Sequence, residues 1–182
     1  MSLHDKSQKK KFSAKGIALV GIMAATLECG KLALSFLPNI EVVTFLLALY
    51  GYVFGIYGVV AAFVFVCIEP LIYGFGTWVV SYFLYWPAVA LVFMIFAKIK
   101  LKNRFVITFT AVALTAWFGV LSSFVDIGLF SGFFENFWYR FGVYYLRGIP
   151  FYAAQISCNA VLFLALFKFF SAKLNGIKQQ FI

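Results

Sequence analysis

Few side chains of this sequence can do chemistry, and the most informative ones lie inside long apolar segments. Glu28 and Lys31 are three residues apart in the first segment, so on a helix they share a face and can pair. Gln155 and Asn159 are four apart in the last segment and also share a face. Charges and amides at such depth must meet protein or water. Each pair is therefore consistent with a structural contact and with the lining of a solute site.

The sequence offers little for catalysis. Its one histidine, His4, lies in the N-terminal tail, and no phosphate-binding G-x-x-x-x-G-K-[ST] loop is present. Cys29, Cys67 and Cys158 are widely separated and form no C-x-x-C pair, as metal or redox sites would. We therefore expect a protein that is not an enzyme and that uses neither a metal nor another cofactor.

The segments that carry these residues are strongly apolar. Of the 182 residues, 64% are hydrophobic and 12% are charged, about half the charged fraction of a typical soluble domain. The apolar runs approach the roughly 20 residues that cross a hydrocarbon core of about 30 Å. The composition thus predicts an all-α, multi-pass membrane protein.

The apolar runs predict six transmembrane helices, which we expect at 16–36, 41–56, 58–74, 78–97, 105–127 and 146–170. A long connection rich in aromatic residues is expected at 128–145. This interpretation divides the chain into a basic tail at 1–15, a six-helix membrane domain at 16–170 and a second basic tail at 171–182.

Basic residues gather in three blocks at the edges of the apolar runs. Five of the 15 Lys and Arg lie at 6–15, four at 98–104 and three at 168–178. Six helices place all three blocks on one side of the membrane, as the positive-inside rule requires. We therefore expect both termini in the cytoplasm, and contact of these blocks with anionic lipid rather than with nucleic acid.

Acids, amides and aromatic rings gather at the opposite helix ends. An interfacial belt of Trp and Tyr is one explanation, and a solute site in the outer half of the protein is the other. The residues that we expect to bind a solute there are Asn39, Glu41, Glu69, Tyr73, Trp78, Asn136, Tyr144, Tyr145, Arg147 and Gln155.

Small residues recur along one side of the first helix, at Ala14, Ala18, Gly21 and Ala25. In lipid, such a face allows the backbone of another helix to come close. The pattern predicts either packing within the protein or the docking of a separate membrane partner.

Several of these motifs together resemble the substrate-binding S components of energy-coupling factor (ECF) vitamin transporters. The length, the helix number and the inside termini agree along the whole chain. The residues that carry the resemblance are the basic tail, Ala14-x-x-x-Ala18, the run Pro38-Asn-Ile-Glu-Val-Val-Thr-Phe-Leu46 followed by Gly51 and Gly55, and Gly148-Ile-Pro-Phe151 leading into Gln155 and Asn159.

The resemblance implies a six-helix fold in the plasma membrane of a bacterium that binds one vitamin at its outer face. It also implies docking, through the Ala14 and Ala18 face, on a transmembrane coupling subunit served by two ATPases. Lys15 within that motif, and the further pair Gly21 and Ala25, depart from the pattern and could shift the docking patch by one turn.

More than one solute and more than one energy source are compatible with the sequence. The pattern is most similar to members assigned to cobalamin, while pantothenate, folate and pyridoxine stay open. A self-contained secondary carrier or channel that uses Glu28 and Lys31 as a charge relay is the competing function. Against it, the sequence has no visible inverted repeat of the kind that many carriers contain.

Overall fold

The computed structural model describes residues 13–181, and most of this range is helical. The basic tail expected at 1–15 therefore lies largely outside the described residues. The helices of the described range are α1 (Ala14–Ala33), α2 (Val43–Phe54), α3 (Ile56–Tyr73), α4 (Trp78–Lys98), α5 (Arg104–Ser131) and α6 (Phe137–Phe181).

Five of these helices are long and apolar enough to cross a membrane, and α2 is the exception. Its 12 residues extend over roughly 18 Å at 1.5 Å per residue, which is short of a hydrocarbon core of about 30 Å. The expectation of an all-α chain is thus confirmed in the described range, and the length and composition of five helices support a multi-pass membrane protein. A sixth crossing by α2, and the side on which the termini lie, stay predictions.

The short helix α2 occupies the middle of the molecule. It packs against each of the other five helices, and ten of its twelve residues are buried. Gly55 ends the helix with a φ of 62°, a left-handed conformation that glycine adopts without steric cost. Because neighbouring helices cover it, α2 does not have to match the thickness of a bilayer.

The last two helices are longer than the sequence predicted. The connection expected at 128–145 shrinks to residues 132–136, and α6 runs on through most of the tail expected at 171–182. The aromatic rings that suggested a loop instead stack one turn apart along α6. The ring centroids of Phe141 and Tyr145 lie 6.0 Å apart, a spacing that stabilises a helix.

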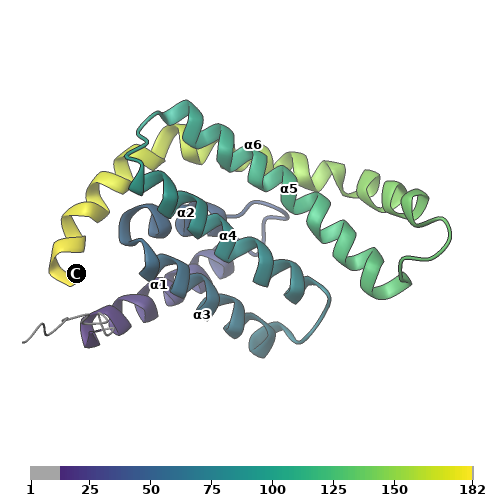
Figure 1. Ribbon diagram of the computed structural model, residues 1–182, viewed down its shortest axis with the longest axis horizontal. Helices are drawn as coiled ribbons and strands as arrows, with labels where there is room; N and C mark the ends of the chain where they lie inside the picture. Colours follow the sequence, from purple (N-terminus) through teal and green to yellow (C-terminus); the bar gives the residue numbers. More distant parts are fainter. Residues whose placement is uncertain (1–12, 182) are drawn as a thin grey trace, which may run out of the picture.

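The ends of the molecule differ in the segments that they contain. The start of α1 and the end of α6 lie at one end, and the α3–α4 and α5–α6 connections lie at the other (Figure 1). The basic segment 168–178 belongs to the first end, and the predicted solute residues Tyr73, Trp78 and Asn136 belong to the second. We call the second the connection end.

Gly51 lets α2 touch α4, and this contact supports a stability prediction. A Cβ at Gly51 would lie 2.0 Å from the carbonyl oxygen of Ala90, whereas a Cβ at Gly21 on α1 would have no atom within 4 Å. We expect Gly51→Ala to cost about 2–3 kcal/mol through overpacking. Gly21→Ala should instead be neutral or stabilise by up to about 1 kcal/mol, because alanine favours helix. Thermal unfolding in detergent measures both, and equal effects would contradict the packing.

Candidate solute-binding site

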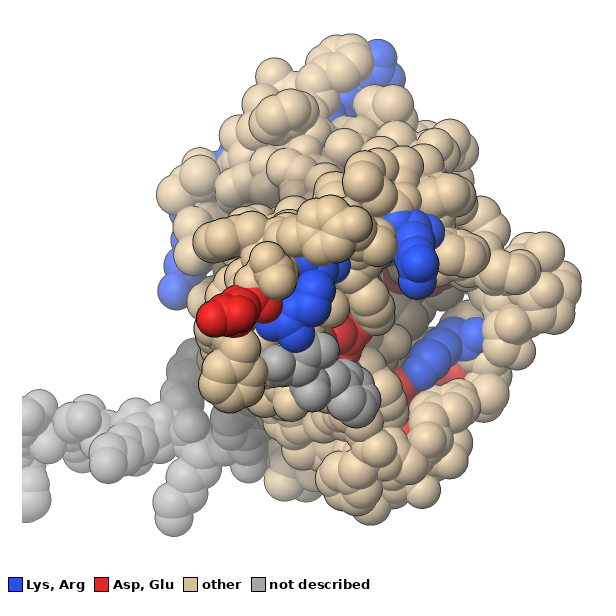
Figure 2. Space-filling view, turned by 90° about the vertical axis from the view of Figure 1, so that its right-hand side faces the viewer, with Lys and Arg blue, Asp and Glu red and all other residues tan. Residues whose placement is uncertain are grey.

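The connection end carries charges of both signs. Figure 2 looks onto this end and shows acidic and basic side chains close together, some of them recessed in a hollow of the surface. A membrane protein places charged groups below its surface only where protein or water compensates them. Behind this surface, charged and polar side chains continue inward to the cavities that they line.

A cavity of about 80 Å³ lies where all six helices or their ends converge. A water molecule needs roughly 10–15 Å³ on this measure, so the cavity has room for several waters or for one small solute. Its lining residues are Lys31, Glu41, Val43, Thr44, Phe65, Tyr82, Tyr85, Trp86, Thr115, Phe118 and Gln155. We call it the central cavity.

The cation at the central cavity is paired with an acid on another helix. Lys31 Nζ donates a hydrogen bond to Glu69 Oε2, and Glu69 is fully buried. The same ammonium lies 4.1 Å from the centroid of the Tyr73 ring and 5.6 Å from that of Tyr82. Two aromatic faces and one carboxylate thus stabilise the charge of Lys31.

The spacing allows Lys31 to pair with Glu28 on the same helix, but in the structure its ion-pair partner is Glu69 on α3. Glu28 lies close enough to interact electrostatically with Lys31 and with Glu69, but it forms no ion pair with Lys31. The physical reason is the burial of Glu69. Its carboxylate has lost all contact with water, so it needs a nearby cation more than the less buried carboxyl group of Glu28 does. Sequence spacing shows contacts along one helix and misses this contact between α1 and α3.

A second acid holds three elements together on another side of the cavity. The amide nitrogen of Asn159 donates to Glu41 Oε1 at 2.8 Å and to Thr115 Oγ1 at 3.0 Å. The other carboxyl oxygen of Glu41 accepts from the backbone N–H of Thr44 at 2.9 Å. Because an amide oxygen would repel the carboxylate, these contacts also fix which way the Asn159 amide points.

Aromatic rings form one wall of the cavity. Tyr82, Tyr85 and Trp86 come from α4, and Phe118 comes from α5. Phe118 lies 4.7 Å from Tyr85 and 6.1 Å from Trp86, measured between ring centroids. Such mutually packed rings offer a large, rigid contact surface to a solute.

Buried polar atoms without a hydrogen-bond partner gather around the central cavity. Each such atom lowers the free energy of unfolding by about 1–3 kcal/mol if it stays unpaired. A group of them therefore marks a place where water or a polar solute supplies the missing hydrogen bonds. In the lining they are Thr44 Oγ1, Tyr85 OH, Trp86 Nε1 and Gln155 Oε1. Behind the lining they are both carboxyl oxygens of Glu28, Glu69 Oε1 and Asn159 Oδ1.

Half of the predicted solute residues meet at this cavity. Glu41 and Gln155 line it directly. Glu69 and Tyr73 reach it through their contacts with Lys31. Trp78 packs on Tyr82, with ring centroids 5.0 Å apart.

Three other predicted residues lie nearer the connection end. Asn39, Tyr144 and Arg147 line a separate hollow of about 470 Å³, and the hydroxyl of Tyr144 donates to Asp126 at 2.9 Å. Arg147 precedes Gln155 by eight residues on α6, which is roughly 12 Å along a helix. This outer hollow is therefore displaced from the central cavity toward the connection end.

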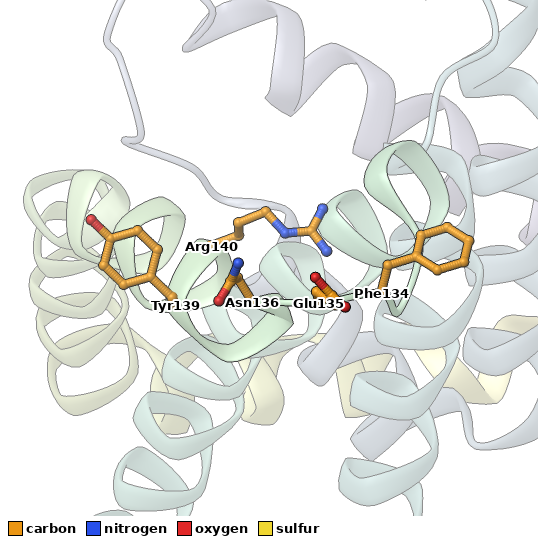
Figure 3. Close-up of a pocket in the computed structure, with 5 residues that line it drawn as sticks. All are labelled: Phe134, Glu135, Asn136, Tyr139 and Arg140. Atoms are coloured by element: carbon orange, nitrogen blue, oxygen red, sulfur yellow. The ribbon is translucent and has the colours of Figure 1, made fainter.

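The two remaining predicted residues lie apart from both spaces. Tyr145 stacks between Phe141 and Tyr152 along α6, with ring centroids 6.0 and 5.4 Å away. Asn136 belongs to a hollow of about 910 Å³ at the α5–α6 connection, whose labelled residues all come from residues 134–140 (Figure 3). A hollow formed by one short segment lacks the convergent elements of a typical ligand site.

Sequence reasoning missed the aromatic wall and the threonines Thr44 and Thr115. A signal for the wall was present, because Tyr82, Tyr85 and Trp86 are spaced so that they fall on neighbouring faces of one helix. The threonines gave no such signal, since isolated threonines are common in membrane helices.

The small residues of α1 face outward. Ala14, Ala18, Gly21 and Ala25 are all exposed, whereas Gly16 on the opposite side of α1 is buried. In the described structure this stripe is therefore not used for packing between the protein's own helices.

Comparisons of the chain with protein-family models, with curated proteins and with solved structures find no match.

Proposed function

We propose that this protein is the substrate-binding membrane subunit of an ECF-type importer of a small vitamin, in the plasma membrane of a bacterium. One observation carries the proposal: a cavity at the meeting point of all six helices is lined by buried polar atoms that lack partners. A structural core would pair or omit such atoms. A binding site keeps them for its solute.

The geometry also favours a route for the solute. The outer hollow around Arg147 gives a wide approach from the connection end, and the central cavity lies roughly two helical turns deeper along α6. A volume of about 80 Å³ is about half that of a cavity that holds one benzene ring, so the cavity takes only a small part of a vitamin, and its volume does not favour pyridoxine over pantothenate, folate or cobalamin.

The energy for import would come from partner subunits. We propose that the outward stripe of Ala14, Ala18, Gly21 and Ala25 docks on a transmembrane coupling subunit served by two ATPases. Small exposed side chains support this role, because they allow close contact between helix backbones in lipid. The basic segments at 98–104 and 168–178 would face the cytoplasm and its anionic lipid.

Directed labelling tests the orientation of the chain. In a cysteine-free background, Glu135→Cys on the α5–α6 connection should react with a membrane-impermeant maleimide in intact cells. Lys102→Cys on the α4–α5 connection should react only after the cells are opened. Both residues are exposed, so accessibility within the protein does not limit either reaction. Labelling of position 102 from outside would contradict the proposed topology.

The solute site is tested by filling the cavity. Gln155→Phe should abolish co-purification of a small molecule, detected by mass spectrometry of the denatured protein. Ala153→Phe is the matched control, because Ala153 is an exposed residue two positions away on the same helix. Equal amounts of co-purified solute in both variants would place binding elsewhere.

A secondary carrier is a second candidate, and the charge cluster supports it. Glu28, Lys31 and Glu69 lie together within apolar helices, an arrangement that proton-coupled carriers use as a relay. Uptake into vesicles that contain this chain alone, driven by a pH gradient without ATP, would favour the carrier. An absolute requirement for ATP and partner subunits would favour the importer.

A further inference from the structure

The central cavity has more acids than bases around it. Glu41 lines it, Glu69 contacts its lysine, and Glu28 lies close to both members of that ion pair. Among the described residues that line the cavity, Lys31 is the one cation. The carboxylates of Glu41 and Glu69 thus share one ammonium group, an arrangement that a further positive charge would balance.

The unpaired atoms call for hydrogen-bond donors. Within the lining, Gln155 Oε1 has no partner, and an amide oxygen only accepts. The indole N–H of Trp86 is the one obligate donor among the unpaired atoms around the cavity. A solute in the cavity must therefore donate a hydrogen bond to Gln155.

The aromatic wall suits a cation as well. Tyr82, Tyr85, Trp86 and Phe118 line the cavity, and the faces of such rings attract ammonium groups. The protein already uses this chemistry, because the Lys31 ammonium lies over the rings of Tyr73 and Tyr82.

We infer that the central cavity selects a small organic cation with N–H donors, such as a protonated amine or an amino-substituted heterocycle. The inference rests on the proposed function, since it names the class of solute for that site. An anion would meet only Lys31, which Glu69 already neutralises. A neutral alcohol could donate, but it would leave the surplus of carboxylates unbalanced.

Three probes of one shape test the inference. Benzylamine, benzyl alcohol and benzoate carry one ring each and a charge of about +1, 0 and −1 at pH 7. Isothermal titration and thermal unfolding of the purified full chain in detergent should rank them in that order. We expect benzylamine to bind about tenfold or more tighter than benzyl alcohol, because charge-assisted hydrogen bonds are the stronger ones.

Charge variants test whether the carboxylates cause the preference. Glu69→Gln keeps the shape and removes one charge, so it should reduce the preference for benzylamine over benzyl alcohol severalfold. Glu135→Gln, on the exposed α5–α6 connection, should leave the ratio unchanged. Should Glu69→Gln fail to fold, Gln155→Met removes an acceptor at nearly constant volume and should weaken benzylamine binding severalfold.

The possible outcomes separate the two proposals. Binding of benzyl alcohol or benzoate as tight as that of benzylamine, lost in Gln155→Phe, would overturn the selection of cations and leave the solute site standing. An unchanged ratio in Glu69→Gln, or unweakened benzylamine binding in Gln155→Met, would overturn it too. No response to any probe at millimolar concentration would count against both proposals.

Discussion

Replacing Lys31 with methionine should lower the free energy of unfolding by about 2–4 kcal/mol. The change leaves the fully buried carboxylate of Glu69 without its cation, and removing one partner of a buried pair costs about 3–5 kcal/mol. We expect a smaller loss because the Lys31 side chain is 29% exposed, so water replaces part of the interaction. Unfolding in detergent, followed by heat or denaturant, measures the difference.

A double variant separates the missing partner from a general loss of packing. Lys31→Met with Glu69→Met should recover most of the stability, because an apolar pair of similar volume is often as stable as a buried ion pair. Lys168→Met, at an exposed lysine of α6, should change stability by about 0.5 kcal/mol or less. A double variant less stable than Lys31→Met would show that the pair itself does not explain the loss.

Replacing Ala18 with tryptophan should abolish ATP-driven uptake by the assembled transporter and leave solute co-purification with the isolated chain intact. The reason is steric, because a large ring cannot fit where two helix backbones meet. Ala18 lies 13 residues before Lys31 on α1, roughly 20 Å along the helix, so the cavity should not sense the change.

Val161→Trp on α6 is the matched control, since Val161 is exposed on another helix. It should leave uptake unchanged, because lipid adapts to a large apolar side chain. Loss of solute co-purification together with uptake in Ala18→Trp would show that this face supports the fold instead of a partner. Uptake assays on reconstituted vesicles and mass spectrometry of the bound fraction give the two measurements.

The sequence predicted the helices better than the contacts between them. Long apolar runs identified every helix, because crossing lipid demands a run of apolar residues. The start of α6 was missed, because Trp138 and Tyr139 suit an interfacial loop and a helix equally well. Only the stacking of neighbouring rings, visible in three dimensions, distinguishes the two.

The residues of the candidate site also divide into those that the sequence predicted and those that only the packing of helices brings together. Glu41 and Gln155 were predictable because polar residues beside or within apolar runs must meet protein, water or a solute. The partner of Lys31 was not, since Glu69 is 38 residues away and only the packing of α1 on α3 joins them. Arg147 and Gln155 were both predicted as solute residues, but eight residues of continuous helix hold the two about 12 Å apart, so they belong to different spaces.

The length of α2 bears on how the chain is assembled during synthesis. Twelve apolar residues are too few to hold a helix across a bilayer by themselves, and nearly all the cover of α2 comes from helices that follow it in the chain. We therefore expect α2 to enter the membrane together with α3, as one hairpin closed at Gly55, and to reach its final depth only after α4 has been made. A chain arrested before α4 should expose α2 to proteases, even though α1 is already inserted.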